Sequence, residues 1–95
     1  MRGGWVYILA SGRNGTLYTG VTADLAARVW QHRNEPKGFV ARYRLRMLVH
    51  VEEYPAIDEA IAREKAIKKW RRRWKLQLIE RDNPEWEDLY KRILG

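Results

Sequence analysis

The pair Asn14-Gly15 restricts the fold of this chain more than any other short feature of its sequence. It lies between two short runs that are rich in β-branched and aromatic residues. An Asn-Gly pair in this setting is the strongest short-range signal for a β-hairpin, because both residues tolerate the positive φ of a tight turn. The sequence therefore predicts a β-hairpin that continues directly into a helix carrying Arg28 and His32.

Alternation predicts the two faces of this hairpin before its register is known. If the loop holds an even number of residues, Tyr7 and Tyr18 lie on the same face, because side chains in a strand alternate with a period of two. Gly20 shares that face and leaves room for another group to approach, and so do Trp5 and Leu9. The opposite face is aliphatic and requires a core; it carries Val6, Ile8, Ala10, Leu17 and Val21.

The segment after the hairpin is predicted to be a helix with cationic groups beside its buried stripe. Thr22 is the expected N-cap, and Asp24 lies in the first turn, where a negative charge suits the helix dipole. Spacing by threes and fours places four residues in a single stripe: Leu25, Arg28, Val29 and His32. Arg28 and His32 are therefore expected next to core-facing residues.

A third strand and a second helix are predicted in the next part of the chain. Residues 45–54 read as a strand with Leu45, Met47, Val49 and Val51 on one face, and Pro55 suits the first turn of a helix that runs to Lys68. Glu64 falls within the apolar stripe of that helix. Its carboxylate either forms a surface ion pair with Lys68, worth a few tenths of a kcal/mol, or serves as a single metal ligand facing the two phenols.

The net charge of +7 favours an anionic partner without identifying it. The excess is concentrated in residues 65–79, which contain no acid. This run is either a solvated face or a surface that follows phosphates by charge, with Lys68, Arg71, Arg72, Arg73 and Lys75 as candidate contacts. Trp70 and Trp74, spaced four apart in the same run, are predicted to face the core.

Two further segments have weaker signals. Residues 33–44 contain the helix breakers Pro36 and Gly38 and are predicted to form a loop that packs on the body. The arginines at alternate positions 42, 44 and 46 indicate a solvated strand edge or, less favoured, a row of phosphate contacts. Near the C-terminus, Asn83 precedes a proline, which predicts a turn and a short helix that Asn83 would cap.

Composition is consistent with one domain spanning residues 1–95. A hydrophobic fraction of 45% over 95 residues allows a modest core. The absence of cysteine excludes a disulfide scaffold and thiolate metal sites. The apolar run at residues 5–10 is too short for a signal peptide or a membrane span, so a cytoplasmic protein without a membrane partner is expected.

Several of these motifs together resemble the GIY-YIG nuclease superfamily, in particular its small stand-alone domains. The resemblance rests on Trp5-Val6-Tyr7, on Tyr18-Thr19-Gly20, and on the helix with Arg28 and His32. The segments AREKAIKKW around Glu64 and NPEWEDL from position 83 are similar to later motifs of the same group. Trp5-Val6 replaces Gly-Ile but leaves Tyr7 in place. The resemblance implies an α+β fold with a small three-stranded antiparallel sheet flanked by helices.

The same resemblance implies a metal-dependent endonuclease that hydrolyses phosphodiester bonds, in DNA rather than RNA, with one Mg²⁺ or Mn²⁺ ion. Tyr7 would take the proton from the attacking water, Arg28 would hold the phosphate, and Glu64 would bind the metal. Tyr18 and His32 would support them, His32 by drawing the proton from Tyr7. Asn83 would border the active site and contact nucleic acid.

Ionising a tyrosine at neutral pH costs roughly 4 kcal/mol, and the cationic neighbours and metal are expected to offset part of this cost. Two other functions compete with the nuclease: a nucleic-acid binding module with little catalysis, and an interaction domain in which Trp86 and the basic helix dock another protein. The set of Tyr7, Tyr18, Arg28, His32 and Glu64 favours the nuclease. The sequence specifies neither the substrate structure nor the oligomeric state.

Overall fold

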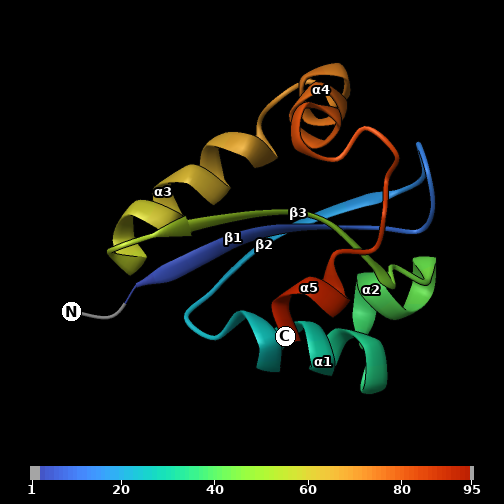
Figure 1. The fold of residues 1–95 in the computed structure, drawn as a ribbon, viewed down its shortest axis with the longest axis horizontal. Coiled ribbons are helices and arrows are strands. Elements are labelled where there is room, and N and C mark those ends of the chain that lie inside the picture. The colour runs from blue at the N-terminus through green and yellow to red at the C-terminus, as the bar shows by residue number, and fades with distance from the viewer. Residues whose placement is uncertain (1–2, 95) are drawn as a thin grey trace.

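The computed structural model describes residues 3–94 and shows an α+β fold built on a three-stranded antiparallel sheet (Figure 1). The strand order is β2-β1-β3, so β1 is central. The strands are β1 (Gly4–Ala10), β2 (Leu17–Thr22) and β3 (Met47–Tyr54). The predicted fold class, a small antiparallel sheet flanked by helices, is confirmed. Among the described residues, no helix is both long enough and apolar enough to cross a membrane.

Helices cover both faces of the sheet (Figure 1). They are α1 (Leu25–Asn34), α2 (Gly38–Tyr43), α3 (Ile57–Lys68), α4 (Arg72–Asp82) and α5 (Tyr90–Leu94). α3 and α4 lie on one side of the sheet, and α1, α2 and α5 lie on the other. The sheet is therefore the middle layer of three, and each of its faces packs against a different set of helices.

The hairpin places Tyr7 and Tyr18 on one face, as predicted. Tyr7 is opposite Gly20 and Leu9 is opposite Tyr18, which places both phenols on one face. The loop spans residues 11–16 and is closed by the Ser11 amide donating to the Thr16 carbonyl at 3.1 Å, with Asn14 at a φ of 57°. A Cβ on Gly20 would collide with the ring of Tyr7, so it is the phenol of Tyr7 itself that occupies the room left by this glycine.

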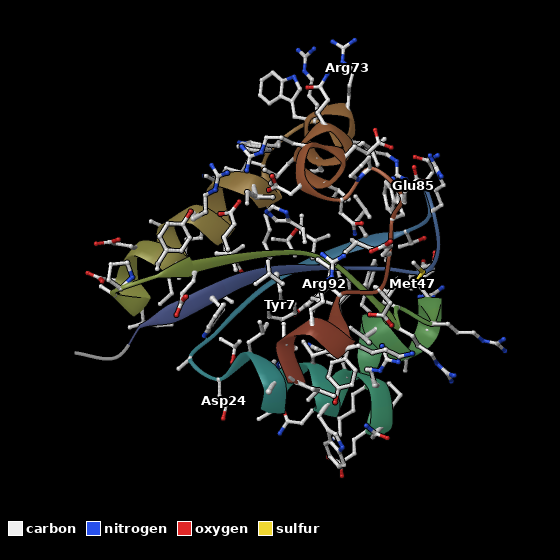
Figure 2. All side chains as sticks on the ribbon, in the orientation of Figure 1. Tyr7, Asp24, Met47, Arg73, Glu85 and Arg92 are labelled. Carbon is white, nitrogen blue, oxygen red and sulfur yellow. The ribbon has the colours of Figure 1, made fainter. Side chains whose placement is uncertain are left out.

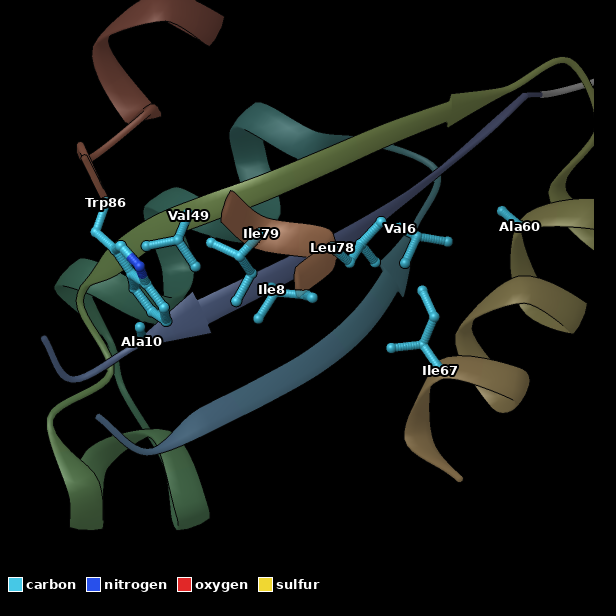
Figure 3. Packing of buried hydrophobic residues seen from close by; sticks show 9 residues of the cluster. All are labelled: Val6, Ile8, Ala10, Val49, Ala60, Ile67, Leu78, Ile79 and Trp86. Atoms are coloured by element: carbon cyan, nitrogen blue, oxygen red, sulfur yellow. The ribbon is translucent and has the colours of Figure 1, made fainter. Parts of the chain in front are cut away.

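Both faces of the sheet are packed. The face toward α3 and α4 carries a buried cluster of Val6, Ile8, Ala10, Val49, Ala60, Ile67, Leu78, Ile79 and Trp86 (Figure 3). The other face carries Tyr7, Leu9, Leu25, Val29, Val40, Leu45 and Leu48. Tyr7 is 1% exposed, so the room that Gly20 leaves on this face is not open to another group. The phenols lie under helices, and Tyr18, but not Tyr7, lines a pocket.

The predicted single face for the third strand is also wrong. The β1–β3 ladder shifts register between Ile8 and Leu9, which pair with His50 and Leu48 and leave Val49 without an opposite residue. A bulge of this kind changes the alternation along the strand. Met47 and Val49 therefore pack toward α3 and α4, whereas Val51 packs with the cluster around Tyr7.

Four local predictions need correction. Residues 38–43, expected to be a loop, form α2, which starts at Gly38 with a φ of 55° and is followed by Arg44 at a φ of 54°. The arginines at 42, 44 and 46 are consequently not on a strand edge. Asp24, not Thr22, caps α1, because its carboxylate accepts from the Ala27 amide at 3.2 Å. Pro55 precedes the N-cap of α3 and lies outside its first turn.

Candidate active site

A buried tyrosine and a buried histidine form the centre of the candidate site. Tyr7 comes from the central strand, and His32 comes from the face of α1 that also buries Leu25 and Val29. The Tyr7 hydroxyl lies 2.8 Å from Nε2 of His32. The ring of Tyr18 packs beside both, with centroid distances of 6.3 Å to Tyr7 and 5.6 Å to His32. Strand alternation and the helix stripe together bring these three rings into contact.

Burial keeps both members of the central pair neutral near pH 7. It raises the pKa of Tyr7 to about 12, against a smaller lowering by hydrogen bonding from the Arg28 guanidinium. Burial also lowers the pKa of His32, and the positive charge of Arg28 lowers it further. A protonated phenol beside a neutral imidazole allows the Tyr7 hydroxyl to donate to Nε2 of His32. Both pKa shifts keep the proton on the Tyr7 oxygen at rest, and the 2.8 Å contact provides the path along which it can move to His32 when Tyr7 receives another proton.

The expected contribution of Arg28 to phenolate formation is present, but it is smaller than the opposing effect of burial. Arg28 does favour phenolate, but the loss of water around a side chain that is 1% exposed outweighs it. Ionising a phenol with a pKa of about 12 at pH 7 costs about 7 kcal/mol. Prior ionisation to a free phenolate is therefore a poor route to a base. A base at this position requires an acceptor for its proton, and His32 is 2.8 Å away.

His32, but not the buried Tyr7, lines a pocket of about 360 Å³ between β2, α1 and the start of α2. Arg28 lines it from α1 and donates to the side-chain oxygen of Gln31 at 3.2 Å. Phe39 closes one side, with its ring centroid 6.3 Å from that of Tyr18. The complete lining consists of Tyr18, Arg28, Gln31, His32, Glu35, Lys37, Phe39 and Val40.

Five of the lining residues were not predicted as site residues: Gln31, Glu35, Lys37, Phe39 and Val40. Gln31 lies three positions after Arg28 on the same helix, so helical spacing would have found it. Lys37 and Phe39 reach the pocket because the chain folds back into α2 after residue 36. Sequence spacing contains no signal for that return. Lys37 adds a second cation to the pocket, which suits an anionic ligand.

Glu64 lies on the buried stripe of α3, as predicted. It is 8% exposed and shares the stripe with Ala60 and Ile67, whereas Ile61, expected on the same stripe, is 37% exposed. α3 packs against β1 and β2, and the negative charge of Glu64 contributes to raising the pKa of Tyr7. The carboxylate is thus near enough for the phenol to sense its charge, although it does not line the pocket.

Lys68 forms an ion pair with Glu64. Its Nζ lies 2.8 Å from Oε2, with the lysine side chain 49% exposed and the glutamate side chain 10% exposed. The ion pair proposed from the sequence is therefore present. It does not exclude a metal ligand, because a half-exposed lysine can leave the carboxylate.

The protein groups fit a metal ion that arrives with its substrate. Within residues 3–94, no group of three or more His, Cys, Asp or Glu side chains is placed to hold a metal. Mg²⁺ commonly binds through one or two carboxylates and completes its shell with substrate phosphates and water. The donor chemistry of one partly solvated carboxylate suits this mode, with Glu64 as the protein ligand.

The basic run is divided among several roles. Arg72 donates to the carbonyls of Asn14 and Gly15 at 2.7 and 2.6 Å, which fastens the start of α4 to the hairpin loop. Lys75 donates to the Lys68 carbonyl at 3.5 Å. Arg71 and Arg73 form no ion pair with any residue between 3 and 94. Figure 2 shows Arg73 at the outer end of α4, far from the side of the sheet that holds Tyr7.

Asn83 belongs to the fold and not to an exposed interface. It is 4% exposed, and its amide nitrogen donates to the carbonyls of Val49 and Glu87 at 3.1 and 2.9 Å. Its side-chain oxygen accepts from the Glu87 amide at 2.9 Å. These bonds occupy the amide, so we remove Asn83 from the candidate nucleic-acid contacts. It ends α4 instead of capping the last helix.

A second polar cluster, on the opposite face of the sheet, was not anticipated. Glu52 accepts from Arg63 at 2.9 and 3.1 Å and from the Tyr54 hydroxyl at 2.7 Å, and lies 2.8 Å from Nε2 of His50. Burial alone would raise the pKa of Glu52, but hydrogen bonds from His50, Arg63 and Tyr54 hold it well below its usual range. The carboxylate is therefore a fixed charge, with donors on both oxygens.

The fold and the site define a class of small α+β proteins in which an antiparallel sheet presents a buried phenol–imidazole pair to a cationic pocket. Comparison with known proteins agrees. The family model described as the GIY-YIG catalytic domain matches residues 3–77. The chain therefore belongs to the GIY-YIG family.

Relatives of similar length carry the name UPF0213. A UPF0213 protein of Desulfotalea psychrophila is 34% identical over 93 residues, covering 94% of this chain and 83% of the relative. A UPF0213 protein of Staphylococcus aureus is 40% identical over 80 residues, covering 80% of this chain and 93% of the relative. The solution NMR structure of the UPF0213 protein BH0048 from Bacillus halodurans is 32% identical, with a TM-score of 0.57 and coverage of 94% and 95%. The fold and the family are thus shared along nearly the whole chain.

Proposed function

We propose that this protein is a metal-dependent endonuclease that hydrolyses phosphodiester bonds in nucleic acid, with DNA as the preferred class. GIY-YIG domains are typically endonucleases, and the residues of this chain supply the required chemistry. The observation that carries the proposal is the 2.8 Å contact between the buried Tyr7 hydroxyl and His32, beside the pocket lined by Arg28.

The proton from the attacking water moves through the central pair. As the water oxygen attacks phosphorus, one water O–H bond breaks and its proton passes to the Tyr7 oxygen, while the phosphorus–oxygen bond to the leaving group breaks and the leaving oxygen takes a proton from solvent. The proton that Tyr7 already holds passes to Nε2 of His32, which becomes a cation. Tyr7 remains neutral throughout, so the cost of about 7 kcal/mol for a free phenolate is avoided. Proton transfer of this kind typically accelerates a reaction 10²–10⁴-fold.

The cationic side of the pocket holds the phosphate. The guanidinium of Arg28 is planar and matches phosphate oxygens with two parallel donors. Lys37 adds a point charge at the same pocket, and Tyr18 packs against the central pair and limits the access of water. When bound at Glu64, a divalent ion such as Mg²⁺ or Mn²⁺ would neutralise charge on the phosphoryl oxygens and assist the leaving oxygen.

Cleavage assays with the purified protein test this proposal. The substrates are duplex, branched and single-stranded DNA and the corresponding RNA, with and without magnesium or manganese. Glu64→Gln should cleave at least about a hundredfold more slowly than the parent, the usual scale for loss of one charge-stabilising element. Glu59→Gln, on the exposed first turn of the same helix, is the matched control and should cleave normally.

Two outcomes would overturn the proposal. Parent-level cleavage by Glu64→Gln with the same metal requirement would leave Glu64 as a structural ion-pair partner of Lys68. Binding without cleavage of any substrate in either metal would identify a nucleic-acid binding module instead of a nuclease.

A further inference from the structure

The tryptophans of the basic run do not have the predicted role. Trp70 is half-buried and packs against the core cluster on the α3–α4 side, as expected. Trp74 is 48% exposed, so the prediction that both face the core is wrong for it. The two indoles meet edge to face at 6.3 Å. A large aromatic ring is thus left on the surface of the most basic helix start in the chain.

Trp74 lies at a hollow of about 520 Å³ between α3 and α4. Its other lining residues are Arg63, Trp70, Gln77, Leu78 and Arg81. The wall beside Trp70 is held rigid, because the Arg63 guanidinium stacks on that ring at 4.9 Å and is fixed at its other side by Glu52. The hollow therefore combines an accessible indole face with a preformed aromatic and guanidinium wall.

Unneutralised charge surrounds this hollow. The Arg71 guanidinium lies 6.0 Å from the Trp74 ring centroid, and neither Arg71 nor Arg73 is ion-paired within residues 3–94. The lining arginines Arg63 and Arg81 are paired with Glu52 and Asp82, so Arg71 is the unpaired cation that lies next to the Trp74 ring. An aromatic platform with cations at its rim suits a ligand that has a flat face and phosphates close by.

We propose that the hollow between α3 and α4 is a second nucleic-acid subsite, in which Trp74 stacks on an unpaired base and Arg71 and Arg73 contact the adjoining phosphates. This inference rests on the proposed function, because it extends the path of the same nucleic acid. α3 and α4 lie on the opposite side of the sheet from the pocket of Arg28, so a strand that fills both sites passes around an edge of the molecule (Figure 1).

The size of the molecule predicts how long such a strand must be. The longest extent of the structure is 35 Å, and stacked nucleotides advance about 3.4 Å each. A strand of about ten stacked nucleotides therefore matches the longest extent of the molecule, and a strand of 20 nucleotides exceeds it with length to spare. Shorter substrates occupy one site at a time and gain nothing from the second.

Equilibrium binding in the absence of divalent metal tests the subsite without requiring catalysis. The probe is a fluorescein-labelled single-stranded DNA of 20 nucleotides. Trp74→Ala should weaken binding about tenfold, within the range for loss of one base–aromatic stack, and Trp74→Phe should retain most of the affinity. Trp30→Ala is the matched control, since Trp30 on α1 is 49% exposed and lies outside both the pocket and the hollow.

Two further arms separate stacking from charge. On a blunt duplex of the same length, whose bases are already stacked, Trp74→Ala should change affinity less than about twofold. The slope of log affinity against log salt should be unchanged in Trp74→Ala but reduced by up to about two units in the Arg71→Ala/Arg73→Ala double variant. Thermal unfolding of each variant confirms that the exposed side chain was removed without loss of the fold.

The kinetic counterpart uses substrate length. For a 20-nucleotide substrate, Trp74→Ala should raise KM about tenfold and leave kcat unchanged, whereas a four-nucleotide substrate should show no change. The inference would be overturned if Trp74→Ala bound the single strand as tightly as Trp30→Ala does. The same result is expected if the hollow binds a protein instead of nucleic acid. That outcome together with Glu64-dependent cleavage would leave the proposed function intact. If the parent protein bound none of these nucleic acids, both the second subsite and the proposed function would be overturned.

Discussion

Two buried histidines on opposite faces of one sheet differ in what surrounds them. His50 is 2% exposed and lies 2.8 Å from Glu52, an ionised carboxylate. His32 is 8% exposed and lies 2.8 Å from the hydroxyl of Tyr7, a neutral phenol. Residue type, burial and distance are nearly the same at the two places. The partners and the access to solvent are different.

These differences separate a structural network from a chemical one. Both oxygens of Glu52 are occupied by donors, and the group is closed by Tyr54 and Arg63. A network in which every donor and acceptor is paired stabilises the fold, and it has no free group that could take up or release a proton. The pair of Tyr7 and His32 is neutral and borders a pocket lined by Arg28. It can therefore move a proton when a phosphate and water enter.

The largest effect is expected from breaking the closed network. Glu52→Ala leaves the Arg63 charge without its partner and should lower the free energy of unfolding by about 3 kcal/mol, at the low end for buried pairs because Arg63 is 31% exposed. Urea denaturation measures this loss. Cleavage per folded molecule should stay at the parent level. Loss of cleavage in a fully folded variant would contradict the assignment of a purely structural role to the Glu52 network.

Low pH tests whether the Glu52 carboxylate is ionised in the folded protein. Because the folded pKa of Glu52 is held below the ordinary glutamate value of 4.5, the stability that its carboxylate contributes is present above that pH and is lost as the pH falls below it. Urea denaturation from pH 7 to pH 3 should therefore show a smaller fall in stability for Glu52→Gln than for the parent. Equal falls would mean that the carboxylate is not preferentially ionised in the fold.

High pH tests whether Tyr7 is a neutral phenol that burial has removed from water. The pKa of Tyr7 rises from 10.0 to about 12 on folding, so its contribution is complete below pH 10 and is lost as the pH rises toward 12. Tyr7→Phe should lose less stability than the parent between pH 9 and pH 11.5. The difference in absorbance at 295 nm between the two proteins should report a phenol that ionises near pH 12. Ionisation near pH 10 would show that Tyr7 is not desolvated.

The smallest effect concerns the cation on Glu64. Lys68 holds the carboxylate that a metal would use, so Lys68→Met should bind Mn²⁺ about fivefold more tightly, equivalent to roughly 1 kcal/mol for a partly exposed pair. Electron paramagnetic resonance of free Mn²⁺ measures this affinity directly. Lys65→Met removes the same charge from the same helix and serves as the control. Equal affinities for both variants would exclude displacement of Lys68.

Local periodicity predicted the parts of the structure that depend on a single element. A period of two placed Tyr7 and Tyr18 on one face, and helical spacing placed Glu64 on a buried stripe. Each of these predictions needs only the geometry of one hairpin or one helix. The residues around the Tyr7–His32 pair were accessible from sequence for this reason.

Features that depend on how elements meet were missed. The bulge at Val49 reverses the faces of β3 through pairing with another strand. The chain folds back into α2 and brings Phe39 next to Tyr18, and no local sequence period predicts this packing. The exposure of Trp74 follows from a break in the helix, because α3 ends at Lys68 and α4 begins at Arg72, so Trp70 and Trp74 do not share one helix stripe.

The proton path from Tyr7 to His32 is the central claim, and a double-mutant cycle on single-turnover cleavage tests it most directly. Tyr7→Phe and His32→Gln should each slow cleavage at least about a hundredfold. If the two residues act as one relay, the double variant should be no slower than the slower single variant, because groups that act as a unit are non-additive. Multiplication of the two losses, or cleavage by Tyr7→Phe at the parent rate, would contradict the relay.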